Sequence, residues 1–119
     1  MSTSTAELID SNKMYHALLK AGEEWADTKA AYHALDDVTA SILADVTQSY
    51  RGSNAGRGEL SRAEAETMAR FSPVYHDHLA SVAVAHKAFL RAQVRYDSLK
   101  TLIELRRSEE STRRQEMRL

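Results

Sequence analysis

Arginine and lysine are the residues of this chain whose spacing best suits a chemical task, the binding of phosphate. Two sets of basic residues recur at helical intervals. Residues four apart form the first set, which is Lys87, Arg91 and Arg95, and residues seven apart form the second, which is Lys100, Arg107 and Arg114. Residues at such intervals share one face of a helix. Arginine binds phosphate oxygens bidentately, a geometry that lysine lacks. Tyr96 lies beside Arg95, where its ring offers a stacking surface for a base.

Acidic residues offer the same arginines a different role. Residues 1–50 hold three basic and eight acidic residues, a net charge of −5, and residues 85–119 hold nine basic and five acidic, a net charge of +4. Glu104, Glu109 and Glu116 also interleave with the C-terminal arginines. The basic residues therefore contact either nucleic acid or acidic side chains. The candidate nucleic-acid-binding residues are Arg51, Arg57, Lys87, Arg91, Arg95, Lys100, Arg106, Arg107, Arg113 and Arg114.

Other kinds of site find no support in the sequence. His76 and His78 are two residues apart in a predicted helix, so they face different directions and do not share a metal ion. His86 falls on an apolar stripe and is expected to be a core or interface side chain. The chain has no cysteine, and no serine has the context of a catalytic triad. We therefore expect no catalytic residue, no metal site, no cofactor and no enzymatic activity.

The elements that must position the basic residues are helices. From about residue 6 to residue 50, two series of residues recur seven apart, and they are Met14, Ala21, Thr28, Leu35 and Ile42, and Leu18, Trp25, Tyr32, Thr39 and Val46. This is a heptad pattern typical of a coiled coil. A helix with one apolar stripe must bury that stripe against another helix.

Start and stop signals divide the rest of the chain. Residues 51–60 form a glycine-rich loop, and Ser61 with Glu64 makes a capping box that starts a short helix over residues 62–70. Ser72 followed by Pro73 starts a long helix. Its apolar stripe is Tyr75, Leu79, Val82, His86, Phe89, Tyr96, Leu99 and Ile103. Residues 106–119 form a charged tail, which is either exposed helix or disordered until bound, and residues 1–5 are expected to be frayed.

These elements predict an all-α fold. We expect a single helical domain over residues 1–119, a long helical hairpin with a short connecting helix. One hairpin cannot cover both apolar stripes, so we expect it to assemble into a helical homo-oligomer. The residues expected in the core or the oligomer contacts are Leu18, Trp25, Tyr32, Leu35, Ile42, Leu79, Val82, Phe89, Tyr96 and Ile103.

Three features that the sequence lacks bear on the cellular compartment of the protein. No apolar run approaches the ~18 residues of a membrane span. The first residues lack the basic and apolar regions of a signal peptide. The absence of cysteine fits a reducing compartment. We therefore expect a cytoplasmic protein without membrane contact, in the cytoplasm of a host cell if it is phage-encoded.

The order of elements resembles one family. A long helix ends in SYRGSNAGRGE (Ser49–Glu59), a short charged helix follows, and SPVY (Ser72–Tyr75) opens a long helix with an arginine-rich end. Over about residues 10–110 this layout resembles the phage recombination mediators of the UvsY type. The resemblance implies a ring-forming helical protein that binds single-stranded DNA, with a recombinase or a single-strand-binding protein as partner.

One departure from the family locates the expected DNA contact. Family members carry basic residues in the helix before the loop, whereas Ser41–Tyr50 contains none. The loop arginines Arg51 and Arg57 and the C-terminal arginines would therefore carry the contact. The expected function is that of a mediator that helps load a recombinase in phage-type homologous recombination. The alternative is a helical protein-interaction module, either a scaffold or a phage-encoded inhibitor or regulator of a host protein, without nucleic-acid binding.

Overall fold

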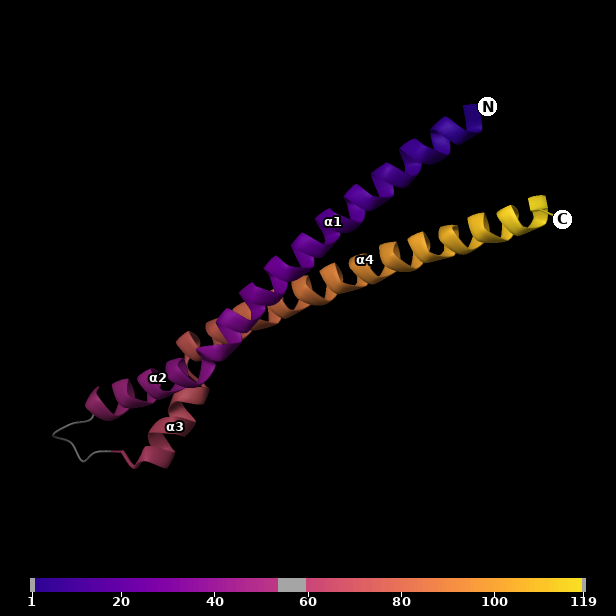
Figure 1. Cartoon of the computed structure of the whole chain (residues 1–119). Helices are drawn as coiled ribbons and strands as arrows, with labels where there is room; N and C mark the ends of the chain where they lie inside the picture. Colours follow the sequence, from indigo (N-terminus) through magenta and orange to yellow (C-terminus); the bar gives the residue numbers. More distant parts are fainter. Residues whose placement is uncertain (1, 54–59, 119) are drawn as a thin grey trace. The chain divides into compact units, whose positions relative to one another are not determined.

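The described part of the chain is almost entirely helical. The computed structural model describes residues 2–53 and 60–118, with side chains described for residues 11–52 and 60–118. Its elements are α1 (Ser2–Asp37), α2 (Thr39–Ser53), α3 (Arg62–Arg70) and α4 (Pro73–Arg118) (Figure 1). Two long helical arms, α1 with α2 and α4, are thus connected through the short helix α3. The predicted fold class, an all-α hairpin with a short connecting helix, is confirmed.

The chain divides into two compact units. The first comprises the described residues of Met1–Thr28 and of Phe89–Leu119, and the second comprises the described residues of Lys29–Ala88. Both α1 and α4 contribute residues to each unit.

In the first unit, α1 and α4 pair antiparallel. Trp25 stacks on Tyr96, with ring centroids 5.2 Å apart and planes inclined by 20°, and Tyr15 contacts Arg107 further along. The contacts therefore advance along α4 as they go back along α1. The half-buried or buried residues include two regularly spaced sets, Met14, Leu18, Ala21, Trp25 and Thr28 on α1, and Phe89, Ala92, Tyr96, Leu99 and Ile103 on α4. Both sets alternate steps of three and four, which confirms the heptad seam in this unit.

Small residues allow the helices to approach closely beside the aromatic pair. Ala21 and Ala92 are 3% and 2% exposed. A Cβ atom at Gly22 would lie 3.4 Å from Cε2 of Tyr96. Glycine lowers helix propensity by ~1 kcal/mol relative to alanine. At this position it leaves room for the Tyr96 ring.

In the second unit, one residue interrupts the first arm. The sequence predicted a continuous helix to residue 50, but α1 ends at Asp37 and α2 begins at Thr39. Asp36 and Asp37 place negative charge at the C-terminal end of α1, where the helix dipole disfavours it. The backbone N–H of Ile42 donates to the Val38 carbonyl at 3.0 Å, so helical bonding resumes at once. The seam also continues, since Tyr32, Leu35, Thr39, Ile42 and Val46 are all half-buried.

Helix α3 packs against α2 through alanine. Ala65 and Ala69 are both 0% exposed, and α2 and α3 are in contact. The backbone N–H of Glu64 donates to Oγ of Ser61 at 3.2 Å, which is the predicted N-cap. The helix spans residues 62–70, as the sequence predicted.

Ser72 holds the junction between α3 and α4. It is 3% exposed, and its hydroxyl donates to the Ala69 carbonyl at 2.7 Å. The same oxygen accepts from the backbone N–H of Tyr75 at 3.2 Å, which caps α4. The predicted start at Ser72 and Pro73 is therefore confirmed.

Replacing Ser72 with alanine is expected to lower the free energy of unfolding by about 1–2 kcal/mol. The change removes an N-cap and a buried hydrogen bond together. Urea denaturation followed by circular dichroism measures the change. Ser81→Ala is the matched control, because the Ser81 hydroxyl is exposed and bonds to the Asp77 carbonyl of its own helix. Equal stability of the two variants would contradict the capping role.

The ends of the elements differ from expectation. Helix α1 begins at Ser2 rather than near residue 6, because serine and threonine are tolerated in the first turn, where backbone N–H groups lack helical partners anyway. Helix α2 continues to Ser53, so residues 51–53 of the expected loop are helical, and residues 54–59 of that loop lie outside the described part. The charged tail is helical to Arg118, so the structure agrees with the first of the two expectations for that segment, an exposed helix rather than a disordered tail.

Two residues expected on the stripe of α4 lie beside it. Leu79 is 38% exposed and His86 is exposed, whereas His78 and Ala85 are half-buried. A seam whose residues are alternately three and four apart, and which includes Tyr75 and Val82, passes through positions 78 and 85. The apolar character of Leu79 favoured it in the sequence, but the register places it at the edge of the seam. The other nine residues of the expected core are half-buried or buried.

Candidate nucleic-acid interface

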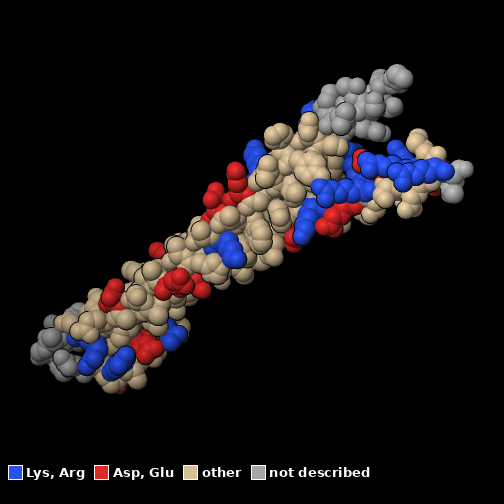
Figure 2. Space-filling model, viewed as in Figure 1, with Lys and Arg blue, Asp and Glu red and all other residues tan. Residues whose placement is uncertain are grey.

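The apolar seam of α4 ends at Ile103, which is 7% exposed. Continuing its alternating spacing leads to Arg106, Glu110 and Arg113, so charged side chains occupy the positions that apolar residues hold earlier. Residues 104–118 are all exposed, although they remain helical. Hydrophobic packing therefore stops while the helix continues, and its arginines stay in contact with solvent. Figure 2 shows Lys and Arg side chains gathered over this part of α4, with acidic side chains among them.

Arg107 is anchored to α1 within the first unit. Its Nε donates to the hydroxyl oxygen of Tyr15 at 3.0 Å, and Nη2 donates to the same oxygen. Its guanidinium carbon lies 5.4 Å from the centre of the Tyr15 ring. The hydrogen bond with Tyr15 raises the pKa of Arg107 above its ordinary value. Arg107 thus stays a cation while its side chain is held in place and exposed.

Arg95 is paired with an acidic residue of α1. Its Nη1 lies 2.6 Å from Oε2 of Glu24, and the two side chains are 57% and 45% exposed. Such an exposed pair contributes little to stability, typically below ~1 kcal/mol. Arg95 therefore takes the alternative role that the sequence offered to the basic residues, which is to pair with the acidic part of the chain.

The remaining predicted residues fall at different places. Arg91, Lys100, Arg106, Arg113 and Arg114 are exposed on α4 in the first unit. Lys87 is exposed on α4 in the second unit, and Arg51 is half-buried near the end of α2. Arg57 lies outside the described residues.

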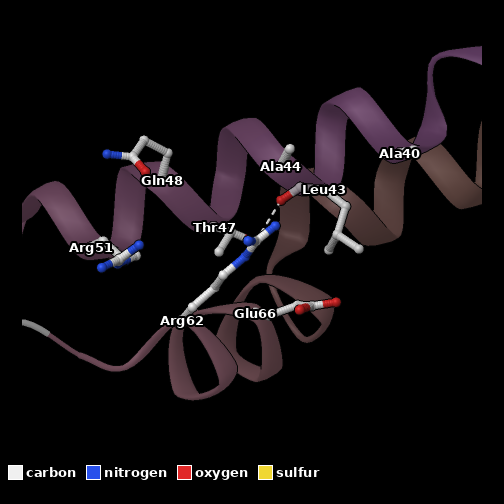
Figure 3. A pocket seen from close by; sticks show the side chains of 8 residues that line it. All are labelled: Ala40, Leu43, Ala44, Thr47, Gln48, Arg51, Arg62 and Glu66. Atoms are coloured by element: carbon white, nitrogen blue, oxygen red, sulfur yellow. Dashed lines mark hydrogen bonds between the residues drawn. The ribbon is translucent and has the colours of Figure 1, made fainter.

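A pocket in the second unit brings Arg51 together with an arginine outside the predicted set. This pocket between α2 and α3 has a volume of about 410 Å³, and Arg62 also lines it. Figure 3 shows Arg62 reaching from α3 into the space beside Thr47. Glu66 lines the pocket too, but its Oε1 lies 3.0 Å from Nη2 of Arg70, which offsets its charge. Nothing in the sequence marks Arg62 for this role, because only the packing of α3 on α2 places it at this pocket.

The aromatic residue expected to stack on a base lies in the seam instead. Tyr96 is half-buried and stacks on Trp25. Phe71, by contrast, is 78% exposed. Phe71 follows the last residue of α3 and precedes the Ser72 cap of α4. Its place between two helix signals is visible in the sequence, but the exposure of its ring is not.

Two of the histidines, His78 and His86, take structural places in the second unit. Nε2 of His78 lies 2.8 Å from Oγ1 of Thr39, and His86 stacks on Tyr32 with ring centroids 4.6 Å apart. Within residues 2–53 and 60–118, no three histidine, aspartate or glutamate side chains come together as metal ligands. Among the described helices, none combines the length and apolar character needed to cross a membrane.

Comparisons with known proteins assign no family and no function to these residues. No protein-family model, curated protein or solved structure matches the chain.

Proposed function

We propose that this protein binds single-stranded DNA as an accessory protein of phage-type homologous recombination. The observation that supports the proposal is the exposed end of α4, where the apolar seam stops at Ile103 and the helix continues to Arg118. This segment carries five arginines, namely Arg106, Arg107, Arg113, Arg114 and Arg118. A rigid helix that presents guanidinium groups to solvent suits the phosphates of a nucleic-acid strand.

The proposed mechanism is electrostatic. Arginines that contact phosphates release counterions, which favours binding without regard to base sequence. A single helix end offers few such contacts, so several copies acting on one strand would bind far more tightly than one. The step that follows, helping a recombinase to load onto the strand, rests on the resemblance of the layout to UvsY-type mediators. A recombinase or a single-strand-binding protein would be the protein partner.

Self-association is part of the proposal. On α4 in the first unit, Leu90, Val94, Leu102 and Leu105 are 44%, 64%, 48% and 57% exposed. Exposed apolar side chains gathered on one segment are typical of interaction surfaces. Light scattering at tens of micromolar protein checks this point, and a stable monomer would contradict it.

The second candidate is a helical protein-interaction module. The observation that favours it is the pairing of Arg95 with Glu24, because it shows one basic residue of the candidate interface already bound to an acidic partner. In this function the exposed leucines and valines of α4 would contact another protein, and the arginines would keep the helix soluble.

The dependence of binding on salt separates the two functions. Fluorescence anisotropy with labelled oligo-dT at about 50 mM and about 200 mM salt measures both the affinity and its slope. The proposed function predicts binding that weakens steeply as salt rises. No binding of the oligomer at high micromolar protein and low salt would overturn it and favour the interaction module.

A further inference from the structure

Tyr15 and Arg107 form a polar contact between α1 and α4 at the surface of the first unit. Tyr15 is 41% exposed, and Nε and Nη2 of Arg107 both donate to its hydroxyl oxygen. The guanidinium carbon lies 5.4 Å from the centre of the ring, so a cation–π contact adds to these hydrogen bonds. Both N–H groups of Nη1 and one N–H group of Nη2 remain as donors. The guanidinium is therefore held in place with donors left for another acceptor.

Two glutamates of α4 are close enough to compete for this guanidinium. Glu104 and Glu110 lie three residues before and three residues after Arg107, a spacing at which opposite charges pair along a helix. The hydrogen bond with Tyr15 contributes most to the raised pKa of Arg107, and the negative charges of the two glutamates raise it further. Among the described residues, however, neither glutamate forms an ion pair with Arg107. The contact with Tyr15 thus takes the place of a pair along α4.

The contact lies on one edge of the helix pair, and the acidic partner of Arg95 lies on the other edge. Tyr15 and Glu24 are nine residues apart on α1, which is two and a half helical turns, so they face opposite ways. The residues that share the edge of Tyr15 on α1 lie three before, four after and seven after it. All of them are uncharged, and they are Asn12, Leu19 and Gly22.

On α4, the same edge is basic. Lys100 and Arg114 lie seven residues before and seven residues after Arg107, so the three share one side of the helix. All three are exposed, and neighbours in this set are ~10 Å apart along the helix. The described part of α1 adds no acidic partner to this edge, whereas Glu24 pairs with Arg95 on the opposite edge. The edge with Tyr15 is therefore the one better suited to an anionic strand.

We infer that a single nucleic-acid strand follows this edge and that Tyr15 is the positioning residue that holds Arg107 on one of its phosphates. The inference rests on the proposed function, and it adds a residue of α1 to a contact otherwise made by α4. A phosphate oxygen accepts from the N–H groups that Tyr15 leaves. Fixing the arginine before the strand arrives reduces the conformational entropy lost on binding.

The test is Tyr15→Phe, which removes the hydroxyl group and keeps the ring. This variant is expected to bind oligo-dT about threefold to tenfold more weakly at about 50 mM salt, because Arg107 loses its fixed position. The slope of log affinity against log salt should fall by up to about 0.7, the share of one phosphate contact. In an Arg107→Ala background, Tyr15→Phe should have no further effect, since the residue that it positions is gone. Fluorescence anisotropy at several salt concentrations measures the wild-type protein, both single variants and the double variant.

Glu24→Gln is the matched control, because it breaks the polar contact of the same two helices on the opposite edge. It releases Arg95 from a carboxylate and should therefore not weaken binding to oligo-dT. If the two contacts served only to hold the helices together, both variants would lose affinity alike. Circular dichroism confirms that each variant retains its helices.

The other outcomes separate the inference from the proposed function. Wild-type affinity in Tyr15→Phe, with weak binding by Arg107→Ala, would overturn the inference, because Arg107 would reach the strand without Tyr15. An equal loss in Tyr15→Phe and Glu24→Gln would also overturn it. Wild-type affinity in both Tyr15→Phe and Arg107→Ala would refute this edge as the path of the strand and leave the proposed function standing on the other arginines. Failure of the wild-type protein to bind oligo-dT would overturn the proposed function itself.

Discussion

The variant with alanine at Arg106, Arg107, Arg113 and Arg114 is expected to bind oligo-dT at least ~100-fold more weakly than the wild-type protein at about 50 mM salt. These residues lie on the exposed part of α4, beyond the last buried side chain of the seam. Removing one arginine–phosphate pair lowers the slope of log affinity against log salt by about 0.7, so four removals should lower it by about 3. Anisotropy titrations at several salt concentrations measure both quantities.

A matched control separates specific contacts from a general loss of positive charge. Replacing the three lysines of α1, Lys13, Lys20 and Lys29, removes a similar charge from another helix. That control variant should bind nearly as the wild-type protein does. Alanine is also a better helix former than arginine, so α4 should stay helical in circular dichroism. An equal loss of affinity in both variants would mean that α4 offers no defined contact.

Replacing Trp25 with alanine is expected to lower the free energy of unfolding by about 2–4 kcal/mol. The change leaves a void at the seam and removes the stacking on Tyr96, whose ring centre lies 5.2 Å away. Because Trp25 is half-buried, we place the loss below that of a fully buried tryptophan. Urea denaturation followed by far-ultraviolet circular dichroism suits this variant, since Trp25 is the only tryptophan of the chain and its removal abolishes tryptophan fluorescence.

Leu19→Ala provides the comparison on the same helix. Leu19 is 66% exposed, so its truncation should change stability by less than ~0.5 kcal/mol. Trp25→Phe should lie between the two, because it keeps an aromatic ring against Tyr96. If Trp25→Ala and Leu19→Ala were equally stable, the aromatic pair would not support the helix pairing.

The helices were predictable because local chemistry determines them. Heptad spacing located the half-buried face of α1 and α2, and the serines at positions 61 and 72 located the starts of α3 and α4. These signals act over a few residues and need no knowledge of the partner helix. The break at Val38 was not predicted, because the apolar spacing of Leu35, Thr39 and Ile42 continues through it without interruption.

The candidate site was predictable only in part. Counting charge along the chain located the arginines of α4, but spacing could not tell which of them contact α1, as Arg95 and Arg107 do. Tyr96 is half-buried and Phe71 exposed, because exposure depends on register and on helix junctions. Arg62 lines the same pocket as Arg51 because two alanines of α3 pack on α2, and the apolar pattern of the sequence does not link these two helices.

The change from apolar to charged residues after Ile103 has a consequence for alignment. A repeat of seven residues allows two helices to slide past each other by one repeat and still match. A slide of α4 by seven residues in one direction would bring Arg106 to the place of Leu99 and Glu110 to the place of Ile103. Burying unpaired charges there would cost several kcal/mol. Arg106 and Glu110 therefore also act as a stop that prevents α4 from sliding past α1 in that direction.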